Sequence, residues 1–434
     1  MSPPVLPPAS TVAPGPLHPP PPPSPSLSDS NSSVASELPP PSPLFSSHDG
    51  TDDASLTDSM TETIPLDHLG GNIGSPAPSV YSLTESLIAN SVKTEHGRKV
   101  QNHSEVYSLP ADNPEFERLD NQHKMITLVL GKYPVPMYDV LRDDNDDNQN
   151  PDKPQKAVLD LGCGTGAWLA DVAVDFPHVE CVGVDLVPPQ ITYAPPNVRT
   201  EIDDINLGLE HFFGCFDVVQ CRLICMGVKD YAGLVDQISR ILRPGGLVIL
   251  GECDFRVYTD KDGGGFELYE SLYESSAPKS TVPEASSSTS SNSKSGSSLP
   301  VEEVSSKKPP SVARFMQHVR TCAKARGGSL DAAMLLHRWV SQHRSFKEVV
   351  ARDVYFPLAP FAKGDSSEAK RQRKIGRMCR DDTMAFLSSG RVLCLKGGIP
   401  GDVVDTLVTE AHAELAAAEI PVYLRLHCIY ARKK

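Results

Sequence analysis

A glycine-rich turn between a short apolar strand and a helix constrains this chain more than any other feature. The stretch Val158–Trp168 reads Val-Leu-Asp-Leu-Gly-Cys-Gly-Thr-Gly-Ala-Trp. Glycines in such a turn let the backbone pass close to a ligand where a Cβ would clash. The helix that begins there presents free N–H groups, which favour an anionic group of the ligand. The turn therefore predicts a site for a nucleotide-like cofactor.

Strand and helix patterns alternate from this turn onward. Short apolar strands are expected at 157–161, 179–184, 198–202, 216–220 and 246–251, with helices at 169–176 and 231–242 between them. Further patterns predict helices near 312–325, 330–342 and 402–418, strands near 348–356 and 422–430, and an early helix from Asn113, its expected N-cap, to Gly131. Strands that alternate with helices are typical of a doubly wound, mostly parallel α/β sheet.

Two segments lack the composition of a folded core. Residues 1–50 contain 16 of the 40 prolines, and serine dominates residues 275–310. Such segments cannot bury enough apolar surface to offset the entropy of ordering, so we expect both to be disordered. We expect the whole tail 1–105 to be disordered, and its proline-rich residues 1–50 to be either a flexible polyproline II-rich segment or a ligand for an SH3 or WW domain. One α/β domain remains, over residues 106–434.

The charge and the cysteine content limit the classes of binding partner that the chain can be expected to have. The net charge is −14, of which residues 1–105 contribute −8, so no electrostatic footprint for nucleic acid is expected. The 10 cysteines form no Cys-x-x-Cys pair, which favours reduced thiols in the cytoplasm or nucleus and no metal site. No apolar run approaches the ~20 residues of a membrane helix, so no membrane partner is expected. The N-terminus does not resemble a secretory signal.

Acidic residues follow three successive predicted strands. Asp160 lies two residues before the first glycine, where a carboxylate can meet an amino group. Asp185 ends the second strand and can accept ribose hydroxyls, and Asp203 and Asp204 follow the third, near an adenine amino group. Parallel strands end at one crevice, so these acids should surround the same ligand. The glycine spacing also fits a dinucleotide, but a carboxylate at Asp160 would repel a pyrophosphate. The pattern therefore favours S-adenosylmethionine (SAM) over NAD.

The pattern resembles the seven-stranded class I SAM-dependent methyltransferases with a Rossmann-like sheet, and most closely the fungal LaeA-like branch. The motifs that carry the resemblance are Tyr107-Ser-Leu-Pro-Ala-Asp, Gly183-Val-Asp-Leu-Val-Pro-Pro-Gln, Pro195-Pro-Asn-Val-Arg and Leu242-Arg-Pro-Gly-Gly. The resemblance covers residues 105–255 strongly and 310–434 loosely. It implies that Asp160, Gly162, Gly164, Asp185 and Asp204 contact the cofactor, with Gly166 shaping the turn. LaeA-like members are nuclear or cytoplasmic regulators of secondary metabolism, often with an undefined methyl acceptor.

The sequence predicts eleven residues for the cofactor site. It comprises Asp160, Gly162, Cys163, Gly164, Gly166, Asp185, Leu186, Asp204, Ile205, Cys221 and Arg222. Arg222 binds an acidic substrate or the cofactor carboxylate, or else pairs with a neighbouring acid. Tyr107 and Trp168 are near the sulfonium or simply packed, and His123 is expected to be a packed, hydrogen-bonded histidine. No obligatory catalytic side chain is expected, because positioning and exclusion of water are the protein's main contribution.

Three functions are compatible with these residues. The leading one is a SAM-dependent methyltransferase that acts on a small molecule or a protein. The second is a SAM-binding regulatory protein that acts through protein contacts with little or no turnover. The third is an NAD-dependent oxidoreductase, in which nicotinamide cofactor would compete with SAM. The basic run Lys370–Lys374 is either a nuclear import signal or a solvated helical face.

Overall fold

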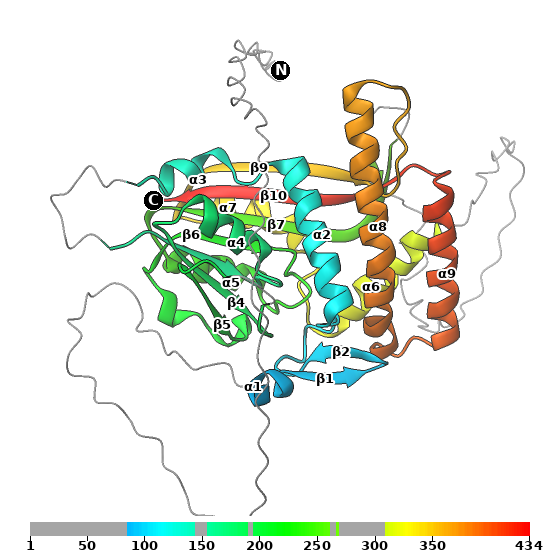
Figure 1. Ribbon diagram of the computed structural model, residues 1–434, viewed down its shortest axis with the longest axis horizontal. Helices are drawn as coiled ribbons and strands as arrows, with labels where there is room; N and C mark the ends of the chain where they lie inside the picture. Colours follow the sequence, from blue (N-terminus) through cyan, green and yellow to red (C-terminus); the bar gives the residue numbers. More distant parts are fainter. Residues whose placement is uncertain (1–84, 144–153, 190–193, 261–265, 269–308) are drawn as a thin grey trace, which may run out of the picture. The chain divides into compact units, whose positions relative to one another are not determined.

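The computed structural model describes residues 85–143, 154–189, 194–260, 266–268 and 309–434, all within one compact unit that spans Gly70–Lys434. Residues 1–84 of the expected tail and most of the expected 275–310 insertion lie outside the described residues. For residues 85–105 the prediction of disorder is wrong. Helix α1 (Glu85–Asn90) leads into an antiparallel hairpin of β1 (Val92–Glu95) and β2 (Arg98–Gln101), shown in Figure 1.

The central sheet confirms the predicted doubly wound, mostly parallel fold. Its strand order is β5-β4-β3-β6-β7-β10-β9, with the short β8 added to the end of β7. The first five strands on this path are parallel, and β10 runs antiparallel between β7 and β9. The bounds are β3 Ala157–Leu161, β4 Glu180–Asp185, β5 Val198–Ile202, β6 Phe216–Arg222, β7 Leu242–Asp260, β8 Phe266–Leu268, β9 Phe346–Pro357 and β10 Val422–Lys433.

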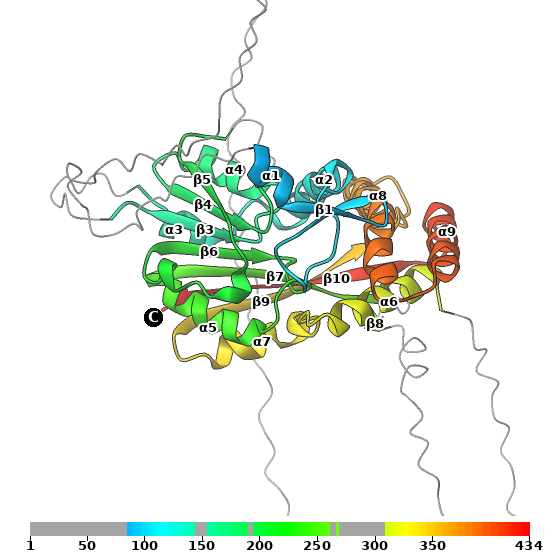
Figure 2. The same cartoon turned by 90° about the horizontal axis from the view of Figure 1, so that it is seen from below.

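Helices cover both faces of this sheet, as Figure 2 shows. On one face α3 (Val135–Val140) and α4 (Ala167–Asp175) share a buried cluster with the inner strands that includes Leu141, Leu169 and Val218. On the other face α5 (Tyr231–Ile241) and α7 (Ala332–Gln342) pack against a larger cluster. The inner strands are buried on both sides, which is why they read as continuous apolar runs in the sequence.

A second group of helices packs beside the carboxyl-end edge of the sheet. It comprises α2 (Asn113–Leu130), α6 (Ser311–Ala325), α8 (Ser367–Lys396) and α9 (Gly401–Ala417). Of helix α8 the sequence indicated only the possible helical face at Lys370–Lys374; the helix lies alongside α2 (Figure 1). Arg118 of α2 bonds to the buried Glu115 at 2.6 Å and to Asp382 of α8 at 2.9 Å. These buried contacts fix α2 against α8.

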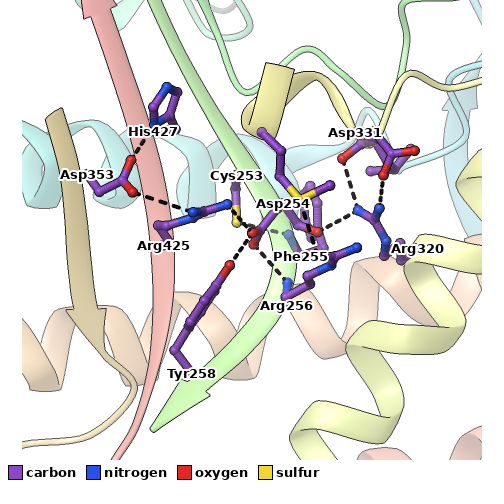
Figure 3. A network of polar contacts seen from close by, with 12 residues as sticks. Cys253, Asp254, Phe255, Arg256, Tyr258, Arg320, Asp331, Asp353, Arg425 and His427 are labelled. Carbon is purple, nitrogen blue, oxygen red and sulfur yellow. Dashed lines mark hydrogen bonds and ion pairs between the residues drawn. The ribbon is translucent and has the colours of Figure 1, made fainter. Parts of the chain in front are cut away.

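A polar network joins the three strands of the antiparallel half of the sheet (Figure 3). The carboxylate of Asp254 on β7 is fully buried and accepts hydrogen bonds from Tyr258 at 2.5 Å and from Arg425 of β10 at 2.7 Å. Arg425 also pairs with Asp353 of β9 at 3.4 Å, and Asp353 contacts His427 of β10. The network therefore holds β10 in register between β7 and β9.

Candidate cofactor site

A cavity lies at the carboxyl ends of β3, β4 and β6, where the order of the strands reverses about β3. In doubly wound sheets ligands bind at this point. Nine of the residues expected from the sequence line it: Asp160, Gly162, Cys163, Gly164, Asp185, Leu186, Asp204, Ile205 and Arg222. Tyr107, His123 and Trp168 line it as well. The structure thus brings together residues from segments that are far apart in the chain.

The glycine turn forms one wall of the cavity. Gly162 has φ +72° and Gly164 has φ +56°, a left-handed region that side-chain-bearing residues rarely adopt. A Cβ on Gly162 would lie 2.4 Å from Cγ2 of Ile224, so the turn leaves no room for one. The amide of Gly164 donates to the carboxylate of Asp185 at 2.8 Å, which ties the turn to the end of β4. The backbone geometry fits the close approach of a ligand.

Asp160 is a buried acid with no cationic partner. Its side chain accepts one long hydrogen bond, 3.4 Å from Nε2 of Gln220, and no ion pair to it is formed among the described residues. Burial raises the pKa of Asp160 to about 7, although the positive charge of Arg222 opposes the shift. A buried carboxylate that lines a cavity and forms no ion pair in the described chain fits a ligand that brings an ammonium group.

Two further acids surround the cavity. Burial raises the pKa of Asp185 to about 6, against the lowering effect of backbone N–H groups from Gly164, Val187 and Leu186. Asp204 accepts hydrogen bonds from the backbone amide and the side-chain amide of Asn206, at 3.0 and 2.7 Å, through one carboxylate oxygen. Both carboxylates keep acceptor capacity for ligand hydroxyl or amino groups.

Arg222 is held by a histidine and not by an acid. Its Nη2 lies 3.1 Å from Nδ1 of His123, and Nε2 of His123 lies 3.0 Å from a carboxylate oxygen of Asp171. Burial and the charge of Arg222 lower the pKa of His123, so the imidazole is neutral, donates to Asp171 and accepts from Arg222. Arg222 makes no direct ion pair with an acid in the described chain, although the charges of Asp160 and Asp171 act on it, and the packed, hydrogen-bonded His123 is confirmed.

Some expected residues are placed differently. Cys221 is fully buried in the cluster on the α5 face and does not line the cavity, because side chains alternate along β6 and it is Gln220 and Arg222 that face inward. Gly166, with φ +79°, is the N-cap of α4 and shapes the turn without lining the cavity. The N-cap of α2 is Asp112 and not Asn113, since the Asp112 side chain accepts from the amide of Glu115.

The sequence did not single out the loop 223–227, which closes the cavity from the β6 side. Ile224 and Gly227 of this loop line the cavity. The loop is anchored by Glu252, a fully buried acid on β7 that accepts from the amide of Ile224 at 3.0 Å and from the hydroxyl of Tyr231 at 2.8 Å. Burial raises the pKa of Glu252 to about 7. No motif marked this anchor, because its partners come from a loop and a helix that are separate from β7 in the sequence.

The sequence also predicted that the chain has no metal site and no membrane helix, and it left two interpretations of the basic run Lys370–Lys374. Within the residues that the structure describes, no three His, Cys, Asp or Glu side chains gather in a way that could hold a metal ion. In that same part of the chain, no helix is both long enough and apolar enough to cross a membrane. The basic run Lys370–Lys374 lies in the first turns of α8, where Lys370 and Lys374 are exposed and Arg371 and Arg373 donate to backbone carbonyls. The run therefore forms a solvated helical face.

A doubly wound sheet with this strand order, a glycine turn after β3 and acids at the ends of β3, β4 and β5 is the arrangement of a class I methyltransferase. A family model described as "Methyltransferase domain" matches residues 152–308. The secondary metabolism regulator laeA of Coprinopsis cinerea is 37% identical over 354 residues, which cover 81% of this chain and 76% of that protein.

Two more distant similarities are of the same kind. Methyltransferase pytC of Aspergillus terreus is 30% identical over 207 residues, which cover 46% of this chain and 59% of that protein. A phosphoethanolamine N-methyltransferase of Haemonchus contortus, solved with S-adenosylhomocysteine, is 16% identical, with a TM-score of 0.32 and coverage of 73% of this chain and 58% of that one.

The chain belongs to the family of fungal LaeA-type secondary metabolism regulators. It is a SAM-dependent methyltransferase with a Rossmann-like fold. Its reaction therefore requires a methyl acceptor in addition to SAM.

Proposed function

We propose that the cavity at the glycine turn binds SAM, with Asp160 at the ammonium group of the methionine moiety. Asp185 accepts from the ribose hydroxyls and Asp204 from the adenine amino group. The observation that carries this assignment is the buried carboxylate of Asp160, which lines the cavity and has no cation of its own. An ammonium group would supply the missing charge.

The remaining residues position and enclose the ligand. The glycine turn allows close approach of the backbone, and Leu186 and Ile205 provide apolar contacts beside the two outer acids. Arg222 is oriented by His123 and can bind the cofactor carboxylate. When bound, SAM supplies both the activated methyl group and the leaving group. The side chains then need to orient the acceptor and exclude water, and no general base is assigned.

Calorimetric titration of the full chain tests the assignment. We expect SAM and S-adenosylhomocysteine to bind and NAD neither to bind nor to compete. Replacing Asp185 with alanine should weaken SAM binding about tenfold to a hundredfold, because hydrogen bonds to a charged group contribute about 1.5–3 kcal/mol each. Circular dichroism checks that the fold is retained. Unchanged SAM affinity in the folded variant would refute the ribose role of Asp185.

We propose that the methyl group is delivered to a small molecule or a protein in the cytoplasm or nucleus. A second candidate function is regulation through protein contacts with little turnover, which the name of the Coprinopsis relative as a regulator favours. The two functions differ in product. Formation of S-adenosylhomocysteine with cell extract as the acceptor source supports the first, whereas tight SAM binding without turnover supports the second.

A further inference from the structure

A second groove adjoins the proposed SAM cavity. It shares Trp168, Gln220 and Arg222 with that cavity and continues across β7 and β10 to Val350 and Arg352 of β9. Gln220 and Arg222 lie on the sheet face that α3 and α4 cover, since Val218, two and four residues earlier on β6, belongs to their buried cluster. A ligand in this groove would therefore lie next to the proposed SAM site.

The register of four strands builds the floor of the groove. Arg222 pairs with Gly251, Gly251 with Cys428, and Cys428 with Arg352, so these residues form one row across β6, β7, β10 and β9. The two central residues of the row, Gly251 and Cys428, are small. A Cβ on Gly251 would meet only Cγ of Arg222 within 4 Å, at 3.7 Å. The row is thus an open floor with a guanidinium at each end.

Arg352 forms no ion pair with an acid in the described chain. Arg222 bonds to the neutral His123, and the negative charges of Asp160 and Asp171 partly compensate its positive charge. Asp353 follows Arg352 on β9, but alternation turns it to the opposite face, where it pairs with Arg425 and His427 (Figure 3). Another cation at the groove, Lys132, is already paired with Asp175 at 2.7 Å. Arg352 therefore remains available to an anion.

The other side chains of the groove are mostly apolar. Ile126 and Leu130 of α2, Tyr133, and Ile249 and Tyr430 of the sheet contribute its walls and floor. Burial raises the pKa of the Cys428 thiol to about 11, so this side chain adds no negative charge at neutral pH. A ligand that matches this surface has an apolar body and an anionic group.

We infer that this groove binds the methyl acceptor, and that the acceptor is a small carboxylic acid with an apolar body, its carboxylate held by Arg352. The inference rests on the proposed function, since it requires SAM in the adjoining cavity. Arg352 lines the groove and not the proposed SAM cavity, whereas Arg222 lines both. Substitution of Arg352 therefore separates acceptor binding from cofactor binding.

The test uses the full chain saturated with S-adenosylhomocysteine and three probes, benzoate, phenylacetate and octanoate, each compared with its primary amide. We expect at least one acid to bind saturably and more tightly than its amide. Arg352→Gln should weaken that binding about tenfold or more, because a charge-assisted pair is lost, and should leave S-adenosylhomocysteine affinity unchanged. Arg338→Gln, an exposed arginine on α7 at the other face of the sheet, is the matched control and should change neither affinity.

A wrong cofactor site and a wrong acceptor groove would give different results in this test. If the unmodified protein does not bind S-adenosylhomocysteine, the proposed cofactor site is wrong. If it binds S-adenosylhomocysteine but none of the acids, or if acid and amide bind equally, the acceptor groove is wrong. Equal acid binding by the Arg352→Gln and Arg338→Gln variants would also overturn the inference.

Discussion

Replacing Arg118 with alanine is expected to lower the free energy of unfolding by about 3–5 kcal/mol, the range for breaking a buried ion pair from one side. Arg118 is 6% exposed and donates to both oxygens of Glu115, at 2.6 and 3.0 Å, and to Asp382 at 2.9 Å. Without it, two carboxylates stay buried without a cation. Urea unfolding followed by circular dichroism measures the change.

An exposed arginine provides the control for this prediction. Arg391 pairs with Asp405 at 2.5 Å at the protein surface. Arg391→Ala should therefore change the unfolding free energy by less than about 1 kcal/mol. Helix α2 also contributes Leu119, Gln122 and His123 to the cavity, so Arg118→Ala should weaken SAM binding as well. Equal stability losses in the two variants would show that burial does not strengthen the Arg118 contacts.

The parallel half of the fold was predictable because its signals are local. Each inner strand is a short apolar run, and β3 and β5 were predicted with the bounds that the structure shows. The hairpin β1–β2 has no such pattern, since four residues of each strand are mostly polar. The hairpin is held against the helices by Arg98 of β2, which bonds to Asp112 at the start of α2 and to Ser388 of α8. Contacts of this kind leave no periodicity in the sequence.

The full length of helix α8 was not predicted from the sequence, for a different reason. Its 30 residues include Gly376 and Gly390, which are unfavourable in helix interiors. The structure explains both positions by close packing. A Cβ on Gly376 would lie 2.3 Å from the carbonyl oxygen of Ala359, and one on Gly390 would lie 3.1 Å from the ring of Phe315. The packing requirement outweighs helix propensity, but only the tertiary structure shows it.

The site was predictable as far as strand ends could locate it. Asp160, Asp185 and Asp204 follow successive strands, and parallel strands bring their ends together. Alternation of side chains along β6 could have excluded Cys221, because Gln220 and Arg222 flank it. The bond between Arg222 and His123 spans 99 residues of sequence, so no local pattern indicates it.

Replacing Asp160 with asparagine is expected to have the largest effect on SAM binding. Asparagine keeps the size of the side chain and can still accept from Gln220, but it cannot pair with an ammonium group. Loss of one partner from a buried charge pair costs about 2–5 kcal/mol of binding free energy. Calorimetry should therefore show SAM affinity reduced by a factor on the order of 30 or more.

The same substitution should stabilise the ligand-free protein at high pH. The pKa of Asp160 is about 7 in the folded protein, above the ordinary aspartate value of 3.8, so the folded state binds the extra proton between these values. Its contribution to stability is then present at low pH and is lost as pH rises through about 7. At pH 8 the Asp160→Asn variant should have the higher Tm, and the difference should shrink as pH falls below 7, so that near pH 4 the two proteins melt almost alike.

Asp402→Asn provides the control, because Asp402 is exposed at the start of α9 and forms no ion pair in the described chain. This variant should melt like the unmodified protein at both pH values and bind SAM normally. Of the two variants, only Asp160→Asn should then gain stability and lose SAM affinity. This result is expected if the buried carboxylate of Asp160 serves to bind a cationic ligand and does not stabilise the fold. An Asp160→Asn protein that is less stable at pH 8 and binds SAM with full affinity would contradict that role.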